Sequence, residues 1–387
     1  MKDKLLTIFK DAFGDSAGAR VFFAPGRVNL IGDHTDYNGG HVFPGALTIG
    51  TYAACRKRED SLLRLYSENF KDEGIIETPL ADTVPEKKLG WVDYVRGVIW
   101  EFKNQGMELP CGLDIAIWGN IPAGSGLSSS ASLEVLTGFF LREIFGFKPT
   151  NTEIALIGQK AENNFCGMNC GIMDQFASAM GKKDHAILLD TATLSYEYAP
   201  LALKGISIVV TNSNVKHSLV TSAYNERRQQ SESALKKLQT VCDIKTLGDL
   251  TMEEFGKAQH VLTDDVEFRR ARHAVSENQR VITAAKMLKE QDVEGFGRLM
   301  NESHVSLRDD YETSCPEMDA LVSEAWKLPG VLGSRITGGG FGGCSVSLVK
   351  DDALQNFQEK LAAVYKEKTG LTPDFYIVSL GDGPAEI

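Results

Sequence analysis

The segment GNIPAGSGLSSSASLEV, residues 119–135, joins an apolar run to a helical pattern through a loop of proline, glycine and serine. Gly124 and Gly126 have no Cβ, so the backbone of this loop can approach a ligand closely. The serines that follow suit a helix N-terminus, whose free N–H groups and positive dipole end attract anions. The segment therefore predicts a site for a di- or triphosphate, and a capped helix after a tight turn is the alternative.

This segment differs from two familiar phosphate-binding sequences. No Gly-Lys-Ser/Thr follows the loop, and the third glycine of the Rossmann fingerprint is missing. A nucleotide phosphate site usually needs Mg²⁺, which prefers hard oxygen ligands. Ser130 offers a hydroxyl in the first helical turn, and Glu162, within QKAENNF, offers a carboxylate. A solvated glutamate on a helix face is the alternative interpretation of Glu162.

A second polar segment, GRVNLIGDHTDYNGGH at residues 26–41, contains two histidines, two aspartates, an arginine and four glycines. Such a composition is not typical of a core segment, and it suits a metal, an anion or a sugar. His34 and His41 are seven positions apart and have no third nitrogen ligand nearby, which argues against a metal.

Two further segments combine small residues with chemistry. ITGGGFGGC, residues 336–344, holds five glycines in six positions between two strand-like runs. Because each glycine costs backbone entropy, close approach to a ligand or to another loop would justify this turn. NCGIMDQFASAMG, residues 169–181, places Asp174 at a small, apolar helix start. Asp174 caps this helix or, beside a phosphate site, serves as a general base.

Composition limits the class of protein. The chain has 387 residues, 43% hydrophobic residues, 24% charged residues and a net charge of −11, which fits two globular domains rather than a nucleic-acid or membrane surface. We expect no membrane span. The seven scattered cysteines favour free thiols in a reducing cytoplasm.

The pattern of apolar residues favours an α+β fold, because strands and helices are interspersed without a strict βαβ rhythm. We expect one domain over residues 1–200 and a second over 201–387, the latter containing the glycine-rich turn 338–343. Strands are predicted at 20–24, 48–56, 63–67, 113–119 and 206–212. Helices are predicted at 91–102, 132–146 and 152–165, with several more between about 217 and 327.

Together the motifs resemble a known superfamily. PGRVNLIGDHTDYNGG, PAGSGLSSSAS and ITGGGFGG follow one another as in the GHMP small-molecule kinases, which include galactokinase, homoserine kinase, mevalonate kinase and phosphomevalonate kinase. The first motif, with NCGIMDQ and SAYNERR (222–228), resembles the galactokinases specifically, and the similarity spans the chain. The resemblance implies an N-terminal domain like ribosomal protein S5 domain 2 and a ferredoxin-like C-terminal domain, with the active site in the cleft between them.

The resemblance also implies an activity, the transfer of the γ-phosphoryl group of ATP to the C1 hydroxyl of D-galactose, and it implies the site residues. Asp174 would be the catalytic base and Arg27 would lie beside the transferring group. The sugar contacts would be Asp33, His34, Thr35, Asp36, Tyr37 and Tyr224. The ATP contacts would be Ser67, Gly124, Ser125, Gly126, Leu127, Ser128, Ser129 and Ser130. The Mg²⁺ ligands would be Ser130 and Glu162.

One position departs from the family pattern, since Asp33 stands where glutamate is more usual. The shorter arm is expected to reach a sugar hydroxyl only through a water or a small loop shift. Three other functions are weighed: a kinase for N-acetylgalactosamine, galacturonate or arabinose, a galactose sensor without turnover, and a scaffold. The intact GSGLSSSAS segment and Asp174 argue against the sensor. We expect a cytoplasmic monomer whose partners are D-galactose and ATP, without nucleic acid or membrane.

Overall fold

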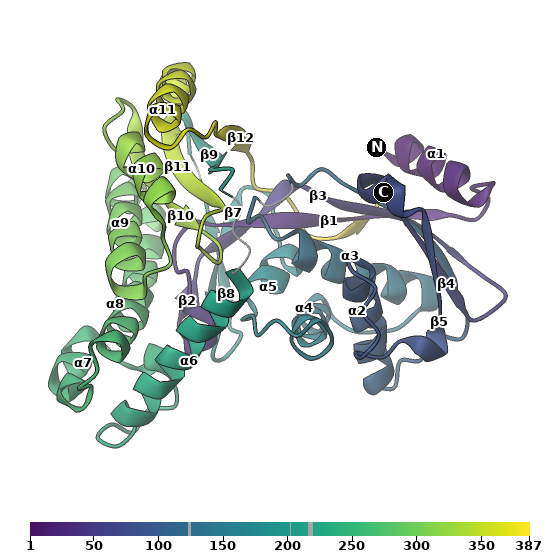
Figure 1. Ribbon diagram of the computed structural model, residues 1–387, viewed down its shortest axis with the longest axis horizontal. Coiled ribbons are helices and arrows are strands. Elements are labelled where there is room, and N and C mark those ends of the chain that lie inside the picture. The colour runs from purple at the N-terminus through teal and green to yellow at the C-terminus, as the bar shows by residue number, and fades with distance from the viewer. Residues whose placement is uncertain (123–124, 202, 216–219) are drawn as a thin grey trace.

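The computed structural model describes residues 1–122, 125–201, 203–215 and 220–387, which form two α+β halves side by side along the longest axis (Figure 1). The first half is built on a six-stranded sheet with the order β13-β1-β3-β6-β4-β5. Its strands are β1 (Arg20–Asn29), β3 (Pro44–Lys57), β4 (Leu62–Ser67), β5 (Ile75–Pro79), β6 (Leu113–Gly119) and β13 (Ala385–Glu386). Its helices are α1 (Lys2–Phe13), α2 (Val92–Asn104), α3 (Ser129–Phe145), α4 (Asn151–Lys160), a π-helix (Ala161–Cys166) and α5 (Met173–Ala179).

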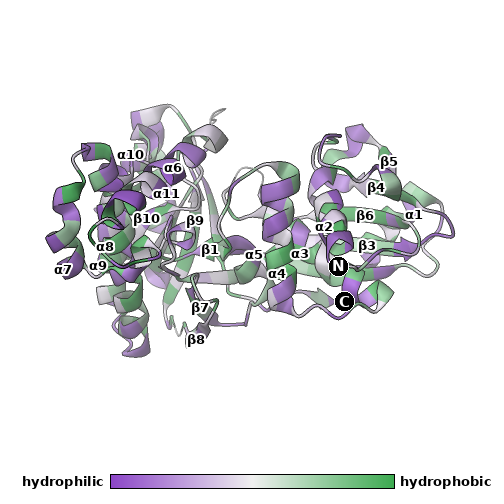
Figure 2. Ribbon diagram, turned by 90° about the horizontal axis from the view of Figure 1, so that it is seen from below, coloured by the Kyte–Doolittle hydropathy of each residue, from purple (hydrophilic) through white to green (hydrophobic). Residues whose placement is uncertain are grey.

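The first half buries both faces of its sheet. Leu65 of β4 and Ile115 of β6 pack in one fully buried cluster with Phe102 of α2 and Phe140 of α3. On the opposite face α1 inserts Phe9 against β3 and β6. Figure 2 shows the hydrophobic colour on β3 and β6 between these helices. Removal of this apolar surface from water is the main force that assembles the layers.

The second half is built on a four-stranded antiparallel sheet with the order β10-β11-β9-β12. Its strands are β9 (Ile206–Asn212), β10 (Val331–Thr337), β11 (Cys344–Lys350) and β12 (Asp374–Val378). Its helices are α6 (Val220–Leu238), α7 (Met252–Ala258), α8 (Asp265–Lys289), α9 (Val293–Ser306), a π-helix (Leu307–Tyr311), α10 (Pro316–Ala325) and α11 (Leu354–Thr369). Ile208 and Val210 face the cluster of α8 and α9, whereas Val209 faces that of α10 and α11. Alternation along β9 therefore places helices on both faces.

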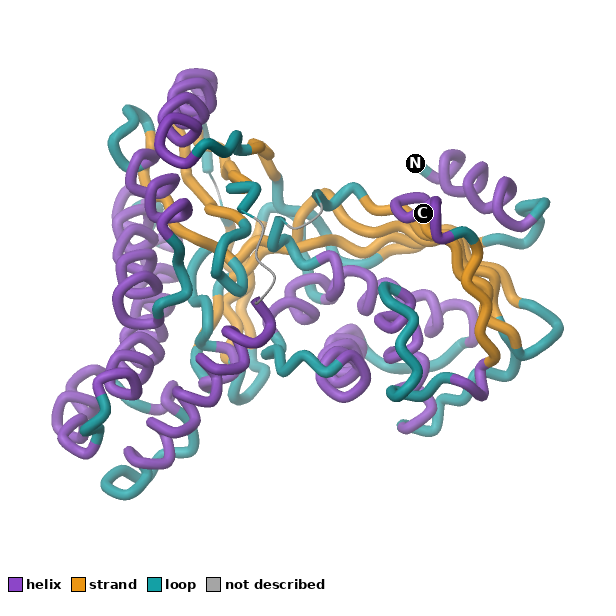
Figure 3. Tube along the Cα trace, viewed as in Figure 1, coloured by secondary structure: helices purple, strands orange, loops and turns teal. Residues whose placement is uncertain are grey.

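The two halves share a core. Val28, Phe43 and Leu127 from the first half lie in one buried cluster with Ile208 and Val346 from the second. A three-stranded sheet of β2 (His41–Val42), β7 (His185–Asp190) and β8 (Tyr196–Pro200) adds to this region. Figure 3 shows the long strands of the first sheet running toward the second half. The ends of β1 and β3 that carry the 26–41 segment therefore lie at the junction.

Most of the predicted elements are present, with two differences. The helix predicted at 152–165 is α-helical only to Lys160 and continues as a π-helix over Ala161–Cys166. The last strand, β13, pairs with β1, so the chain returns to the first sheet after the second half is complete. The division at residue 200 stays a prediction. Among the described helices, none has the length and hydropathy that a bilayer crossing requires.

Candidate active site

Two adjoining cavities lie between the halves. The larger, about 740 Å³, is lined by the N-terminus of α3 and by the glycine-rich turn. The smaller, about 170 Å³, is lined by residues of the 26–41 segment and of the loop before α5. The cavities share Arg27, Ser130, Met168, Asp174 and Gly339. Molecules bound in the two cavities would therefore meet at these residues.

The larger cavity begins at the start of α3. Residues 125–130 all line it, as the motif predicts, and Gly124 lies outside the described residues. Gly126 has a φ of +66°, a left-handed conformation that favours glycine. The Ser125 hydroxyl is buried and has no hydrogen-bond partner among the described residues. With the free N–H groups of the first helical turn, it leaves donors available to an anion.

Ser128 corrects the expectation that the serines cap α3. It occupies the N-cap position, but its side chain makes no bond to the first turn, and its backbone φ is +57°. Its hydroxyl donates instead to Oδ2 of Asp174 over 2.5 Å. The left-handed backbone accounts for this, because it turns the side chain away from the helix. Ser128 therefore ties the phosphate loop to the predicted catalytic residue.

Arg27 and Asp174 form a bidentate ion pair at the junction of the cavities. Nε and Nη2 of Arg27 donate to the two carboxylate oxygens of Asp174, each over 2.7 Å. Nη1 donates to the carbonyl of Gly126 over 2.6 Å. Burial would lower the pKa of Arg27, but the charge and hydrogen bonds of Asp174 raise it above its ordinary value. The guanidinium therefore stays charged beside the point where the cavities meet.

Asp36 lines the smaller cavity and is held by the backbone. The N–H groups of Tyr37 and Met173 donate to its two oxygens over 3.1 and 3.4 Å. Gly171 lies so close that a Cβ there would meet the Asp36 carboxylate at 1.9 Å. Burial, and then the negative charge of Asp174, raise the pKa of Asp36 to about 6. Among the described residues no Lys, Arg or His forms an ion pair with this carboxylate.

Asp33 lines the same cavity but has a partner that sequence analysis missed. Arg335 of β10, fully buried, donates to Oδ2 of Asp33. Asn29 donates to Oδ1 over 2.9 Å, and the N–H of Gly338 donates to the same oxygen over 3.3 Å. Burial raises the pKa of Asp33, whereas Arg335 opposes this effect. The sequence offered one indication of this pair, because Arg335 lies within the strand pattern SRIT and a buried arginine needs an acidic partner.

The other predicted sugar contacts divide into two groups. Tyr224 of α6 lines the smaller cavity. Thr35 does not line it, and its hydroxyl is bonded to the carbonyls of Gly32 and His41 over 2.8 and 2.6 Å. Tyr37 does not line it either, and its hydroxyl lies among neighbouring side chains. Thr35 and Tyr37 thus support the segment through internal bonds, while direct sugar contact by either stays a prediction.

Glu162 and Ser130 both line the smaller cavity, so the structure brings the predicted Mg²⁺ ligands together. Glu162 is 5% exposed and accepts from Nε2 of Gln175 over 2.7 Å. Burial and the nearby Asp174 charge raise the pKa of Glu162 to about 7. The same Gln175 nitrogen donates to the fully buried Glu134 over 2.9 Å, a second carboxylate that sequence analysis missed. Glu162 is therefore not the solvated glutamate of the alternative interpretation.

His34 and His41, the pair of the rival metal interpretation, have different hydrogen-bond partners. Nδ1 of His41 lies 2.9 Å from the Asn278 amide oxygen, and Nδ1 of His34 lies 2.8 Å from the Tyr37 hydroxyl. Across the described part of the chain, no group of three or more His, Cys, Asp or Glu side chains is arranged to hold a metal ion.

Ser67, the remaining predicted nucleotide contact, ends β4 and is 3% exposed. It is not among the residues that line the larger cavity. Its role stays a prediction.

The glycine-rich turn closes the larger cavity and meets another loop. A Cβ on Gly340, whose φ is +84°, would lie 2.4 Å from the carbonyl of Thr313. The N–H of Phe341 donates to that same carbonyl over 2.6 Å. Glycine is therefore needed here for close approach between two backbones, as the sequence suggested.

Comparisons with known protein families match this arrangement. Residues 93–182 match the GHMP kinases N terminal domain, and residues 284–367 match the GHMP kinases C terminal domain. Residues 7–57 match the galactokinase galactose-binding signature. The two domains and the paired cavities between them thus define a kinase of the GHMP class with its two-domain α+β fold.

Individual relatives narrow the class. The chain is 51% identical to a galactokinase of Bacillus subtilis (strain 168), over 100% of this chain and 99% of that protein. It is 52% identical to a galactokinase of Clostridium acetobutylicum, over 100% of this chain and 98% of that protein. The chain belongs to the galactokinase family.

Solved structures agree. The crystal structure of Lactococcus lactis galactokinase complexed with galactose matches with a TM-score of 0.97 at 45% identity, covering 100% of both chains. The mevalonate kinase of Methanococcus jannaschii matches with a TM-score of 0.68 at 17% identity, over 95% of this chain and 99% of that one. The second match shows the shared fold alone.

Proposed function

We propose that this ATP-dependent sugar kinase transfers the γ-phosphoryl group of ATP to the C1 hydroxyl of D-galactose, giving α-D-galactose 1-phosphate and ADP. The observation that carries the proposal is the position of Asp174, in the wall shared by the two cavities. A sugar in the smaller cavity and a triphosphate in the larger would bring acceptor and donor together there. The 45% identity to the Lactococcus lactis galactokinase, which was crystallised with galactose, supports the choice of sugar.

Asp174 would accept or steer the proton of the C1 hydroxyl. Its side chain is 30% exposed toward the cavities, and three donors of Arg27 and Ser128 orient its carboxylate. Because both oxygens are held, the carboxylate is prepositioned for a substrate hydroxyl. Arg27 lies where it would also stabilise negative charge on the transferring group. Phosphoryl transfer depends mainly on such positioning and electrostatic stabilisation.

The sugar would be recognised by complementary hydrogen bonding in the smaller cavity. The Asp33 and Asp36 carboxylates accept hydrogen bonds from hydroxyls, and the Tyr224 ring forms part of the wall. Asp33 already accepts from Arg335, Asn29 and the N–H of Gly338, whereas Asp36 accepts from two backbone N–H groups, so fewer lone pairs of Asp33 are free. Asp36 is therefore the stronger candidate for a direct sugar contact.

Mg²⁺ fits Ser130 and Glu162 as ligands. The buried Glu162 carboxylate has no ion pair with a Lys, Arg or His within the described residues, and burial, followed by the negative charge of Asp174, raises its pKa to about 7. A hydroxyl and a carboxylate are hard oxygen ligands of the kind that Mg²⁺ takes beside nucleotide phosphates. When bound, the ion would neutralise charge on the β- and γ-phosphates.

We also propose that the chain acts as a cytoplasmic monomer. The residues assigned above to catalysis, to the sugar and to the nucleotide all lie in this chain, and both of its halves contribute to each cavity. All seven cysteines are free thiols, as expected in a reducing compartment.

The direct test measures ADP release from MgATP with galactose, glucose, N-acetylgalactosamine, arabinose, galacturonate, mevalonate and homoserine. We expect turnover with galactose that EDTA abolishes. Turnover with another acceptor only would overturn the choice of galactose as substrate, and galactose binding without ADP release would favour a sensor.

Asp174→Asn should lower kcat by at least about a hundredfold, because orienting and proton-accepting groups typically contribute that much. Galactose affinity, measured by calorimetry, should change little, and a variant that keeps most of its turnover would contradict the role of Asp174.

A further inference from the structure

His34 has one ring nitrogen paired inside the protein and one without a partner. The side chain is 4% exposed, and Nδ1 lies 2.8 Å from the Tyr37 hydroxyl. Nε2 is buried and has no hydrogen-bond partner among the described residues, yet His34 lines the smaller cavity. A buried polar atom without a partner is costly, so a ligand in this cavity is the natural source of one.

The ring of His34 is neutral and carries a single N–H. Burial, and then the neighbouring His273 and arginine charges, lower the pKa of His34 well below its ordinary value. A neutral imidazole donates from one nitrogen and accepts at the other. The group bonded to Nδ1 therefore decides what Nε2 offers to the cavity.

A chain of hydroxyls leads from Nδ1 into the second half of the molecule. The Tyr37 hydroxyl lies 2.9 Å from the Tyr311 hydroxyl, which lies 2.8 Å from Oγ of Ser231. Tyr311 and Ser231 are both fully buried. The Tyr311 ring also packs on the His34 ring, with 4.8 Å between centroids. The chain thus connects α6, the π-helix Leu307–Tyr311 and the sugar-binding segment.

Ser231, at the far end of this chain of hydroxyls, favours one direction for the hydrogen bonds along it. Within the described residues, the Ser231 hydroxyl has one partner, Tyr311. A buried hydroxyl with one partner is satisfied best when it donates, because its hydrogen would otherwise be unpaired. Tyr311 then donates to Tyr37, and Tyr37 donates to Nδ1. In this arrangement Nδ1 of His34 would be the acceptor, and the ring hydrogen would reside on Nε2.

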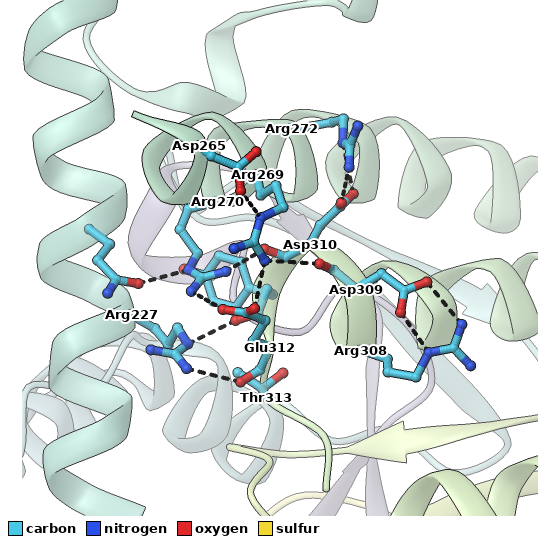
Figure 4. A network of polar contacts seen from close by, with 12 residues as sticks. Arg227, Asp265, Arg269, Arg270, Arg272, Arg308, Asp309, Asp310, Glu312 and Thr313 are labelled. Carbon is cyan, nitrogen blue, oxygen red and sulfur yellow. Dashed lines mark hydrogen bonds and ion pairs between the residues drawn. The ribbon is translucent and has the colours of Figure 1, made fainter. Parts of the chain in front are cut away.

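Arginines surround Glu312, the residue after Tyr311, and Figure 4 shows their contacts with it. Nε of Arg227 donates to the Tyr311 carbonyl over 2.8 Å. Arg269 and Arg270 both pair with Glu312, over 2.7 and 2.5 Å. Glu312 follows Tyr311 directly and has a φ of +54°. These ion pairs stabilise a left-handed turn at the end of the π-helix and so fix where the Tyr311 ring lies.

We propose that Ser231, Tyr311 and Tyr37 are positioning residues that set His34 as a hydrogen-bond donor, through Nε2–H, to one oxygen of the bound sugar. The inference rests on the proposed function for the identity of that ligand. It assigns complementary roles within the cavity, because the aspartates accept from sugar hydroxyls whereas His34 donates. If the sugar hydroxyl that faces His34 is replaced by fluorine, the fluorine can still accept a hydrogen bond from Nε2–H. That analogue should therefore bind more tightly than the one in which hydrogen replaces the hydroxyl.

The first test needs no substrate. Two-bond ¹H–¹⁵N spectra of the ligand-free chain, with His34 assigned by comparison with His34→Gln, report which nitrogen carries hydrogen. We expect the Nε2–H form in the intact chain and a mixture of both forms in Tyr37→Phe. An Nδ1–H form in the intact chain would overturn the proposal whatever the chain phosphorylates.

The second test uses the kinase reaction, with Tyr365→Phe as the matched control. Tyr365 is also fully buried in the second half, and its hydroxyl donates to the Ser213 carbonyl over 2.9 Å. Ser231→Ala and Tyr311→Phe should raise KM for galactose about three- to tenfold, the scale of one hydrogen bond. KM for ATP and kcat should stay within about twofold, as should all three parameters of Tyr365→Phe.

The sugar analogues give the specific readout. Monodeoxy and monodeoxyfluoro galactoses, substituted at C2, C3, C4 or C6, are compared as competitive inhibitors. We expect the intact chain to prefer fluorine over hydrogen at one position, and that preference should weaken in Ser231→Ala and Tyr311→Phe but not in Tyr365→Phe. Equal preferences in all four proteins would overturn the role of the hydroxyl chain. If the intact protein bound no galactose at all, the proposed function would be wrong instead. The spectra would still decide the direction of the hydrogen bonds between Ser231 and His34.

Discussion

Replacement of Asp36 by asparagine should make the ligand-free protein more stable at neutral pH. Asp36 is a carboxylate with no ion pair among the described residues, and it shares the cavity wall with Asp174. Its charge is therefore unfavourable in the folded chain until a sugar supplies hydroxyl donors. Asparagine has nearly the same shape and removes that charge.

The magnitude follows from the pKa of Asp36, which is about 6 against an ordinary value of 3.8. At about 1.4 kcal/mol for each pH unit, the ionised carboxylate costs roughly 3 kcal/mol at pH 7.5. The variant keeps one acceptor for the two backbone N–H groups and loses about 1 kcal/mol for the other. The net gain in the free energy of unfolding is about 2 kcal/mol.

The sign depends on pH in a defined window. Between the ordinary pKa of 3.8 and the raised value of about 6, the folded chain binds more protons at Asp36 than the unfolded chain does. The free energy of unfolding therefore falls as the pH rises through this window. At pH 5, inside this window, part of the penalty is already removed, so the advantage of Asp36→Asn should shrink to under about 1 kcal/mol, and below the window the penalty disappears.

Urea unfolding of the intact chain and of Asp36→Asn, at pH 5 and 7.5 without ligands, measures both quantities. Asp33→Asn is the matched comparison, because it leaves the buried Arg335 without its partner and should destabilise the protein by about 3–5 kcal/mol. Calorimetry should show that Asp36→Asn binds galactose more weakly despite its greater stability. The reasoning would be refuted if Asp36→Asn destabilised the chain as Asp33→Asn does, or if its effect were the same at both pH values.

Three further predictions concern the junction and the larger cavity. Arg27→Lys loses the bidentate contact with Asp174. Because such a donor typically contributes about 2.7–4 kcal/mol of transition-state stabilisation, kcat in the ADP-release assay should fall by about a hundredfold or more. A loss below tenfold would contradict the role of Arg27. The Mg²⁺ concentration for half-maximal activity should rise as the pH falls through about 7, because protonation of Glu162 removes a ligand. Glu162→Gln should raise that concentration and flatten its pH dependence, and an unchanged requirement would exclude Glu162 as a ligand. Gly340→Val should raise KM for ATP at least about tenfold while galactose affinity changes little. The valine side chain would displace the glycine-rich turn from Thr313. Unchanged ATP kinetics would show that this turn does not shape the nucleotide site.

Much of the fold could be predicted from local sequence. Alternating apolar residues marked β4 and β6, and apolar residues at the helical period marked α2 and α3. The π-helix at Ala161–Cys166 was not predictable in this way, because its sequence continues the pattern of α4. The pairing of β13 with β1 was also hidden, since two residues carry too little periodicity to mark a strand.

The residues of the site were also largely predictable, whereas their partners were not. Motif chemistry pointed to Asp174 and Glu162, the family resemblance added Arg27 and Asp36, and the structure brings all four to the same pair of cavities. Ser128 was predicted to serve the helix, yet its hydroxyl bonds to Asp174 because its backbone adopts a left-handed conformation. No local pattern predicts such a conformation for a serine.

The sequence by itself predicted the kinds of chemistry present: a helix start suited to an anion, a carboxylate-rich segment suited to a sugar, and a glycine turn that approaches another backbone. Residue type and close spacing suffice for these, because each depends on groups only a few positions apart. Only the tertiary structure decided which distant groups meet. Arg335 pairs with Asp33 across 302 positions. Tyr311 contacts Ser231 across 80 positions and Tyr37 of the 26–41 segment across 274. Burial makes each of these pairings necessary, since a charge or hydroxyl withdrawn from water must find its partner in whatever part of the chain the fold brings beside it.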